Sequence, residues 1–269
     1  GVPQQQETDT AYKTLTIKSG DQILKTGYTA TLRGRQNVEI RPQVSGIITE
    51  ICINEGDAVH KGQTLFIIDQ IPYKAALQTA IANVKSAEAK LATAKLTADS
   101  KAELYKEQVV SEFDLQTARN EQIAAEAALA QAKAQEVNAR NDLSYTEVKS
   151  PVDGVASMIP YRVGALVNSS ITEPLVTVSD DSEVYAYFSM TENQILDFVQ
   201  QYGSLKKAIE HLDKVELTMS NGKTYSSLGK VDAISGTIDE GTGAISLRAV
   251  FSNPDQFLRN GGSGTVVVP

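Results

Sequence analysis

The sequence is poor in the residues that enzymes most often place at their active sites. Its 269 residues include two histidines, His60 and His211, which lie far apart in the chain. Neither histidine has cysteines or acidic residues at metal-ligand spacing, and no Ser-His-Asp order or nucleophile elbow occurs. The adjacent carboxylates Asp180 and Asp181 fall in an expected turn, where such pairs usually stay solvated. We therefore predict no catalytic residue, no metal ligand and no cofactor.

The sequence also contains a single cysteine, Cys52. One cysteine excludes an intramolecular disulfide and says nothing about the redox compartment. Because Cys52 belongs to the apolar run Ile47–Ile53, we predict that it is a buried small hydrophobe.

The sequence also lacks an excess of basic residues and any long apolar segment. The net charge is -8 and the pI is near 4.9, whereas nucleic-acid binding requires clustered Lys and Arg. No nucleic-acid partner is therefore expected. No segment approaches the roughly 20 apolar residues of a membrane span. Residues 1–6 are polar and do not form a secretory signal. We expect that a targeting segment preceded them and is missing from the sequence.

A pattern of short strands and glycine turns occurs twice, once on either side of a long helical segment. Gly46 and Gly56 are ten residues apart, and so are Gly154 and Gly164. In both copies a valine follows the second glycine by three residues, and a short apolar strand comes next. Such a repeat predicts two half-motifs, related by pseudo-twofold symmetry, that close into one β-domain. We expect the four glycines to occupy turns that require a positive φ.

The segment between the half-motifs has the pattern of two long helices. Apolar residues recur every seven positions from Leu77 to Tyr105 and again from Leu115 to Leu143, with lines of alanine between them. These heptads predict an antiparallel coiled-coil hairpin that folds back at residues 108–111. At a rise of 1.5 Å per residue, about 35 residues per helix give a projection of roughly 50 Å. A hairpin of that length is expected to reach a partner.

Two polar residues disturb the heptads of the second helix. Gln122 and Glu136 fall on its apolar line. An alternative register, shifted by one residue, would place Ile123 and Val137 at the interface instead. The heptad pattern alone leaves both registers open.

A second β-domain is expected after Ser179. Residues 184–190 alternate as a strand, and Thr191 opens a capping box for a short helix that ends near Tyr202. The dipeptide Asn221-Gly222 is the strongest hairpin signal in the chain. Later strands, with an added one from residues 22–32, predict a small antiparallel β-barrel.

The half-motifs resemble a lipoyl or biotinyl carrier domain, in which a lysine at the turn joining the halves holds the cofactor. Here the helical hairpin replaces that turn, so we do not expect Lys61 or Lys74 to carry one. A lipoyl-like domain split by a helical hairpin and followed by a β-barrel resembles the periplasmic adaptor (membrane fusion protein) family of tripartite efflux pumps. The stretches most specific for this family are Arg41–Ile48, Glu55–Val59, Lys61–Asp69, Leu143–Pro151, Gly241–Ala249 and Phe251–Asp255. Of these, Arg41–Gly46 and Phe251–Asp255 most resemble adaptors of resistance-nodulation-division (RND) pumps.

The resemblance implies an elongated, multidomain α+β chain. The expected parts are a partial membrane-proximal segment (1–27), a first barrel strand (28–37), the two lipoyl-like halves (38–71 and 144–180), the hairpin (72–143) and the β-barrel (181–269). The family commonly has an N-terminal lipid anchor, and most of its membrane-proximal domain would lie beyond this sequence. Asn260–Gly264 replaces the family's usual Pro-Gly-Met.

The resemblance also implies a docking site at the hairpin tip. The family carries an Arg, Leu and Ser set there, which meets an outer-membrane channel. Leu104 and Ser111 match the Leu and the Ser, while the Arg position holds Ser100. Either Lys101, which is adjacent to Ser100, or Arg119 would replace the arginine, and Val110 lies in the turn itself. Ser111 is also suited to cap the returning helix. Leu104 is also suited to pack between the two helices near the turn.

The function that follows is a non-catalytic adaptor in the periplasm of a Gram-negative bacterium. It would bridge an inner-membrane RND transporter to an outer-membrane channel and assemble as a trimer or a hexamer. The runner-up is an adaptor of an ABC exporter or a type I secretion system. A fragment of a cofactor-carrying acyltransferase is a third hypothesis, which a lipoyl or biotinyl mass increment would reveal.

Overall fold

The computed structural model describes residues 25–269. The strand expected at residues 11–17 lies outside this range. The described chain divides into two compact units. One, here called the hairpin unit, comprises residues 32–185 and 252–262, and the other, the barrel unit, comprises residues 25–31, 186–251 and 263–269. No helix within residues 25–269 is long and apolar enough to cross a membrane.

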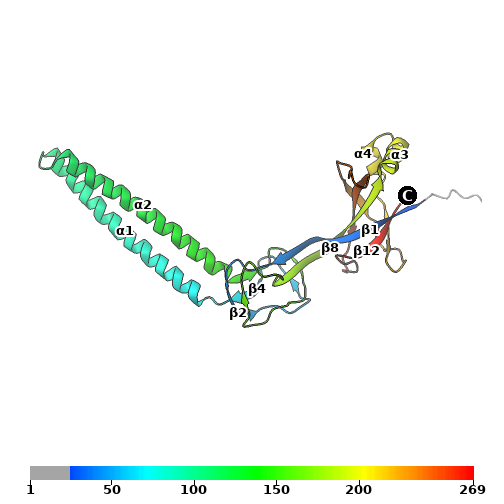
Figure 1. Cartoon of the computed structure of the whole chain (residues 1–269), viewed down its shortest axis with the longest axis horizontal. Coiled ribbons are helices and arrows are strands. Elements are labelled where there is room, and N and C mark those ends of the chain that lie inside the picture. Colours follow the sequence, from blue (N-terminus) through cyan, green and yellow to red (C-terminus); the bar gives the residue numbers. More distant parts are fainter. Residues whose placement is uncertain (1–24) are drawn as a thin grey trace, which may run out of the picture. The chain divides into compact units, whose positions relative to one another are not determined.

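Two long antiparallel helices form the hairpin (Figure 1). Helix α1 spans Ile71–Lys106, with Pro72 in its first turn, where a missing amide hydrogen costs nothing. Helix α2 spans Glu112–Tyr145. The predicted coiled-coil hairpin is confirmed. The buried residues of its interface are Leu77, Ala80, Val84 and Ala98 of α1, and Leu115, Ala118 and Ala132 of α2.

In the structure, the heptad line of α2 that faces α1 is the one that contains the two polar residues. Gln122 and Glu136 are half-buried in the seam, whereas Ile123 and Val137 are 61% and 57% exposed. The polar ends of both seam residues extend along the helix, because Gln122 Nε2 donates to Glu126 and Glu136 accepts from Arg140, both at 3.2 Å. The alternative register is therefore wrong.

The lipoyl-like domain of the hairpin unit combines strands from both half-motifs. A four-stranded sheet has the order β5-β4-β2-β7, and β6 pairs with β3 and β8. The strands are β2 (Gly46–Ile51), β3 (Ala58–Val59), β4 (Thr64–Ile68), β5 (Glu147–Lys149), β6 (Gly154–Ala156), β7 (Leu166–Val167) and β8 (Val176–Thr191).

The two half-motifs exchange equivalent strands. Gly46 of the first half pairs with Val167 of the second, and Gly154 of the second half pairs with Val59 of the first. Each half thus completes the other in the same way, which is the arrangement expected of a pseudo-twofold repeat. Between the halves lies a shared core in which Ile48, Leu65, Phe66, Ile68, Val167, Leu175 and Val178 are fully buried.

The two glycine turns are also hydrogen-bonded across the half-motifs in an equivalent way. Gly56 N–H donates to Ala156 O at 3.0 Å, and Gly164 N–H donates to Ile48 O at 2.8 Å. The φ angles of Gly56 and Gly164 are 83° and 96°, a backbone conformation that favours glycine. For this pair of glycines the expected positive φ is present.

The other two glycines serve a different purpose, so the expectation of a positive φ was wrong for Gly46 and Gly154. Both open strands, β2 and β6, where a neighbouring strand passes very close. A Cβ at Gly46 would lie 2.5 Å from Ile68 Cγ2, and one at Gly154 would lie 2.6 Å from Ser179 O. Absence of a side chain, and not backbone freedom, is what these positions require.

The expected burial of Cys52 is also wrong, because its side chain is exposed. Cys52 directly follows β2, and its N–H donates to Leu65 O at 2.8 Å. Side chains alternate along this extended stretch, and Ile53, 7% exposed, takes the inward position.

Asp181 is less solvated than expected of an acid in a turn. It lies within β8, and its buried Oδ1 has no hydrogen-bond partner. A Cβ at Gly34 would collide with this oxygen. Burial, and secondarily the charge of Asp180, raise the pKa of the Asp181 carboxyl, although Arg259 opposes the shift.

Six strands contribute to the barrel unit, which contains residues 26–31 of β1 and residues 186–191 of β8, while the rest of these two strands belongs to the hairpin unit. The order of the six strands is β10-β11-β8-β1-β12-β9, and a bridge between Val215 and Gly229 links the chain before β9 to the chain before β10. The first residues of β1, from Thr26 to Thr31, pair with β12. The predicted barrel is confirmed. Its remaining strands are β1 (Thr26–Ile40), β9 (Glu216–Met219), β10 (Lys230–Ile234), β11 (Ala244–Ser252) and β12 (Ser263–Val268).

Local signals in the barrel unit work as expected. Helix α3 (Glu192–Tyr202) begins with a complete capping box between Thr191 and Gln194. The turn at Asn221-Gly222 is present, with Gly222 at φ 81°. A second short helix, α4 (Leu205–Glu210), was not expected from the sequence.

We predict that Gly164→Ala destabilises the lipoyl-like domain. An alanine at φ 96° costs about 1–2 kcal/mol, which lowers the melting temperature by several degrees. Gly236→Ala is the matched control, because a Cβ there meets nothing within 4 Å. Thermal unfolding followed by circular dichroism measures both, and equal melting temperatures would contradict the prediction.

We also predict that Asp181→Asn stabilises the protein at neutral pH. The pKa of Asp181 is raised in the folded state, so folding disfavours its ionised form above the ordinary carboxyl pKa of about 4. The gain in melting temperature should be present at pH 7.5 and disappear as the pH falls below about 4, where both states of the wild type are protonated. Asp142→Asn, on the exposed side of α2, is the control.

Candidate functional site

The end of the hairpin is a short, hydrogen-bonded loop between α1 and α2. Gln108 N–H donates to Tyr105 O at 3.0 Å, and Val109 N–H donates to Leu104 O at 2.9 Å. Gln108 has a φ of 61°, the left-handed conformation that commonly ends a helix. The tip of the hairpin therefore has a defined backbone shape.

Ser111 begins the returning helix. Its Oγ accepts a hydrogen bond from Asp114 N–H at 3.2 Å, and its own N–H donates to Asp114 Oδ2 at 3.3 Å. This reciprocal capping box satisfies two amides that the helix leaves free. Glu112 and Asp114 also place negative charge in the first turn of α2, where the helix dipole favours it.

The four expected tip residues differ in exposure. Ser111 is exposed, whereas Leu104, Val110 and Lys101 are half-buried. Lys101 lies a whole number of heptads after Ala80, which is buried against α2. Lys101 is therefore on the side of α1 that faces α2 and not on its outer face. It is a poor positional substitute for an outward-facing arginine at position 100.

Two prominent tip residues were missed from the sequence. Phe113 is 77% exposed and Val109 is 64% exposed. Phe113 lies two residues before the seam residue Leu115, so its heptad position faces away from α1. The register of α2 was therefore the signal that could have identified it.

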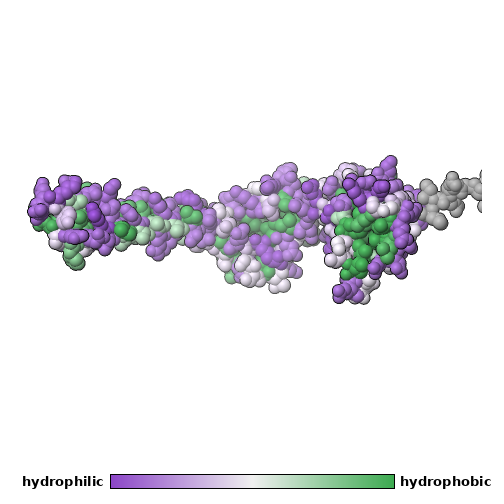
Figure 2. Space-filling view, turned by 90° about the horizontal axis from the view of Figure 1, so that it is seen from above, coloured by the Kyte–Doolittle hydropathy of each residue, from purple (hydrophilic) through white to green (hydrophobic). Residues whose placement is uncertain are grey.

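Charge at the tip is mostly negative. From residue 103 to residue 114 the chain has four carboxylates and one lysine. The lysine, Lys106, is 3.3 Å from Glu103 in an ion pair. In Figure 2 the hairpin surface is largely hydrophilic, with apolar residues showing between the polar ones.

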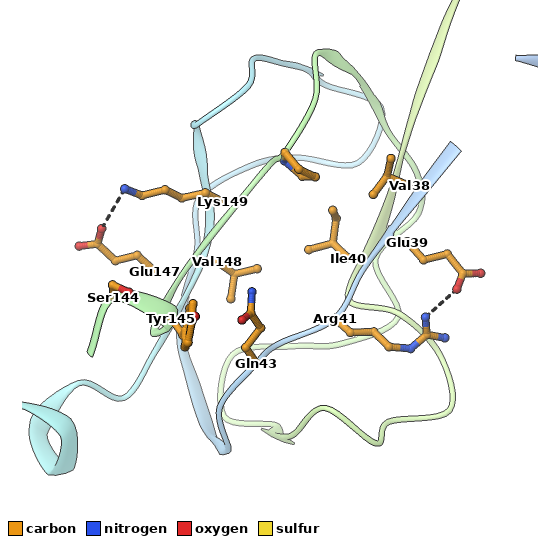
Figure 3. Close-up of a pocket in the computed structure, with 11 residues that line it drawn as sticks. Val38, Glu39, Ile40, Arg41, Gln43, Ser144, Tyr145, Glu147, Val148 and Lys149 are labelled. Carbon is orange, nitrogen blue, oxygen red and sulfur yellow. Dashed lines mark hydrogen bonds and ion pairs between the residues drawn. The ribbon is translucent and has the colours of Figure 1, made fainter. Parts of the chain in front are cut away.

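A cavity of 420 Å³ lies in the lipoyl-like domain (Figure 3). Two cations line it, and each is paired with a neighbouring carboxylate: Arg41 with Glu39 at 2.6 Å, and Lys149 with Glu147 at 3.8 Å. Because the charges cancel in pairs, this cavity offers no strong anchor for a charged ligand. Within residues 25–269, no group of three or more His, Cys, Asp or Glu is arranged to hold a metal ion.

The position of a carrier lysine is occupied by the base of the hairpin. The halves are joined from Ile68 at the end of β4, through α1 and α2, to Glu147 at the start of β5. Lys61 lies in a different turn, where its N–H donates to Asp153 Oδ1 at 2.7 Å. Lys74 lies in the first turn of α1.

Family models match nearly all of the described chain. The barrel-sandwich hybrid domain of RND membrane fusion proteins (MFPs) matches residues 36–179, and the β-barrel domain of RND MFPs matches residues 183–267. A model described as biotin-requiring enzyme matches residues 2–68, in agreement with the lipoyl-like half-motif. The chain belongs to the RND membrane fusion protein family.

Similar proteins of known name support this assignment. Multidrug resistance protein MdtE of Escherichia coli K12 is 36% identical over 231 residues, which are 86% of this chain and 60% of MdtE. The multidrug/solvent efflux pump periplasmic linker protein MepA of Pseudomonas putida is 33% identical over 239 residues, 87% of this chain and 59% of MepA. The chain thus spans about three-fifths of the length of these relatives.

Solved structures agree on the fold. MacA from Actinobacillus actinomycetemcomitans superposes with a TM-score of 0.68 at 23% identity, covering 91% of this chain and 78% of MacA. A MacA-MexA chimeric protein containing the Pseudomonas aeruginosa MexA α-hairpin domain gives a TM-score of 0.61 at 26% identity, covering 91% and 80%.

We predict that Ser111→Ala loosens the tip locally. Loss of the N-cap costs about 1 kcal/mol, which should accelerate amide exchange in the first turn of α2 about fivefold. Thr117→Ala, an exposed threonine further along α2, should leave exchange at the tip unchanged. Hydrogen exchange followed by mass spectrometry makes the comparison, and equal rates in the two variants would show that the capping box does not hold the tip.

Proposed function

We propose that the chain is the greater part of a periplasmic adaptor of a tripartite efflux pump, which bridges an inner-membrane RND transporter and an outer-membrane channel without catalysing a reaction. The observation that carries the proposal is the hairpin itself. Two helices of 36 and 34 residues span about 50 Å and end in a capped tip. The names of the relatives, a multidrug resistance protein and an efflux pump periplasmic linker, support this role.

In this proposal the tip meets the channel, while the barrel unit and the chain outside this sequence meet the transporter. The protein would lie in the periplasm of a Gram-negative bacterium, associated with the inner membrane. Leu104 and Ser111 are the proposed docking residues, with Val110 in the same turn. Lys101 is the weakest member of the set because it lies in the seam.

We also propose that the adaptor is a homo-oligomer, either a trimer or a hexamer. A second heptad line supports lateral association of hairpins. Ile123, Ala130 and Val137 recur every seven residues on α2 and all three are exposed. Lateral packing of helices requires such a repeated apolar line.

Crosslinking of the native cell envelope followed by mass spectrometry tests the assembly. The expected result is recovery of both an RND transporter and an outer-membrane channel with the adaptor. Recovery of an ABC transporter as the sole inner-membrane partner would replace the proposed pump by the runner-up, an ABC-type or type I system.

We predict that Leu104→Asp or Ser111→Arg abolishes drug resistance while leaving the transporter bound. Loss of a central interface residue costs about 2 kcal/mol, or about 30-fold in affinity. The matched control is Ala92→Asp, at an exposed position of α1. The measurement is growth of an adaptor-deletion strain on pump substrates, and full resistance in well-expressed tip variants would remove these residues from the docking site.

A further inference from the structure

The hairpin tip presents two apolar side chains that are largely uncovered within residues 25–269. Phe113 and Val109 are 77% and 64% exposed, although a fully buried side chain of this kind gains about 1.5–3 kcal/mol. Val109 N–H is hydrogen-bonded to Leu104 O, and Phe113 lies between the two partners of the capping box. Their backbone is thus ordered before binding, which lowers the entropic cost of docking.

Acidic residues flank this apolar pair in the sequence. The twelve residues from 103 to 114 carry a net charge of -3. Glu107 and Glu112 border the loop on its two sides, and both are exposed. Asp114 adds a third carboxylate beside Phe113.

We propose that Val109 and Phe113 dock together into an apolar recess at the periplasmic end of the outer-membrane channel, and that Lys or Arg side chains border this recess. The inference rests on the proposed function, which supplies the channel as the partner. An exposed aromatic residue is a common centre of binding energy, and complementary charge at the rim fixes specificity and orientation. The one cation between residues 103 and 114, Lys106, is already paired with Glu103, so the proposal assigns the positive charge of this contact to the partner.

Charge also argues against a second copy of this chain as the occupant of the tip. Two tips of net charge -3 would place like charges opposite each other, which opposes association. The uncharged line through Ile123 and Val137 is better suited to contacts between copies.

Photocrosslinking tests the partner and its chemistry. The photoreactive residue p-benzoylphenylalanine replaces Phe113 in the full-length adaptor within intact cells, and replaces Leu96 in a matched control. Leu96 lies further from the tip on α1 and is similarly exposed, at 72%. We expect position 113 to form adducts with a periplasmic segment of the outer-membrane channel that contains or adjoins Lys or Arg, and position 96 to form none with the channel.

The acidic rim is tested in the same system. Glu107→Lys should lower the yield of the adduct at position 113 about fivefold, because it places a positive charge against the proposed basic rim. This change also suits the C-terminus of α1, so the hairpin should remain folded. Glu121→Lys, further along α2 and equally exposed, should change the yield less than about twofold. An unchanged or increased yield with Glu107→Lys would refute the basic rim.

A third crosslinking position separates the two proposals. Gln108 lies in the same loop and is exposed. Channel adducts from position 108 without any from position 113 would overturn the Phe113 contact and leave the adaptor function standing. Adducts from position 113 with a second adaptor copy, or with the transporter, would also overturn it. No channel adduct from either position would overturn the adaptor function itself.

Discussion

The reciprocal pairing of the two half-motifs is the constraint on which the hairpin unit depends. Gly46 pairs with Val167 and Gly154 pairs with Val59, so neither half is complete alone. The insertion must therefore leave one half and return to the other at neighbouring points. Ile67 pairs with Glu147 across β4 and β5, which places the two ends of the hairpin side by side. An inserted helix that departs and returns at adjacent strands has to fold back on itself.

The helices then have to hold each other with little buried area. Alanines at the seam allow a close approach but bury few atoms per layer, so packing energy is spread thinly along the hairpin. The end remote from the β-domain has the fewest neighbouring elements, and such ends open most easily. The capping box of Ser111 and Asp114 and the left-handed residue Gln108 counter this tendency at the point where partner recognition is proposed.

Regular patterns in the sequence predicted the architecture, whereas close contacts and individual orientations required the structure. Glycine spacing identified the repeat, yet it did not distinguish a turn at Gly56 from a close approach at Gly46, since both need glycine. The apolar run around Cys52 predicted burial but not which side of the extended chain faces the core. The burial of the Asp181 carboxylate was not predicted, because Gly34, which lies against it, is distant in sequence. Phe113 became recognisable only after the register of α2 was known.

Partner choice at the tip depends on charges close to it and not on the charge of the whole chain. The net charge of -8 is distributed over a molecule whose hairpin alone extends about 50 Å. At physiological ionic strength interactions between exposed charges are screened within about 8 Å. The carboxylates of Glu107 and Glu112 therefore act on a docking surface almost independently of the β-domain. Apolar contact by Phe113 would provide affinity, and these nearby carboxylates would select which surface receives it.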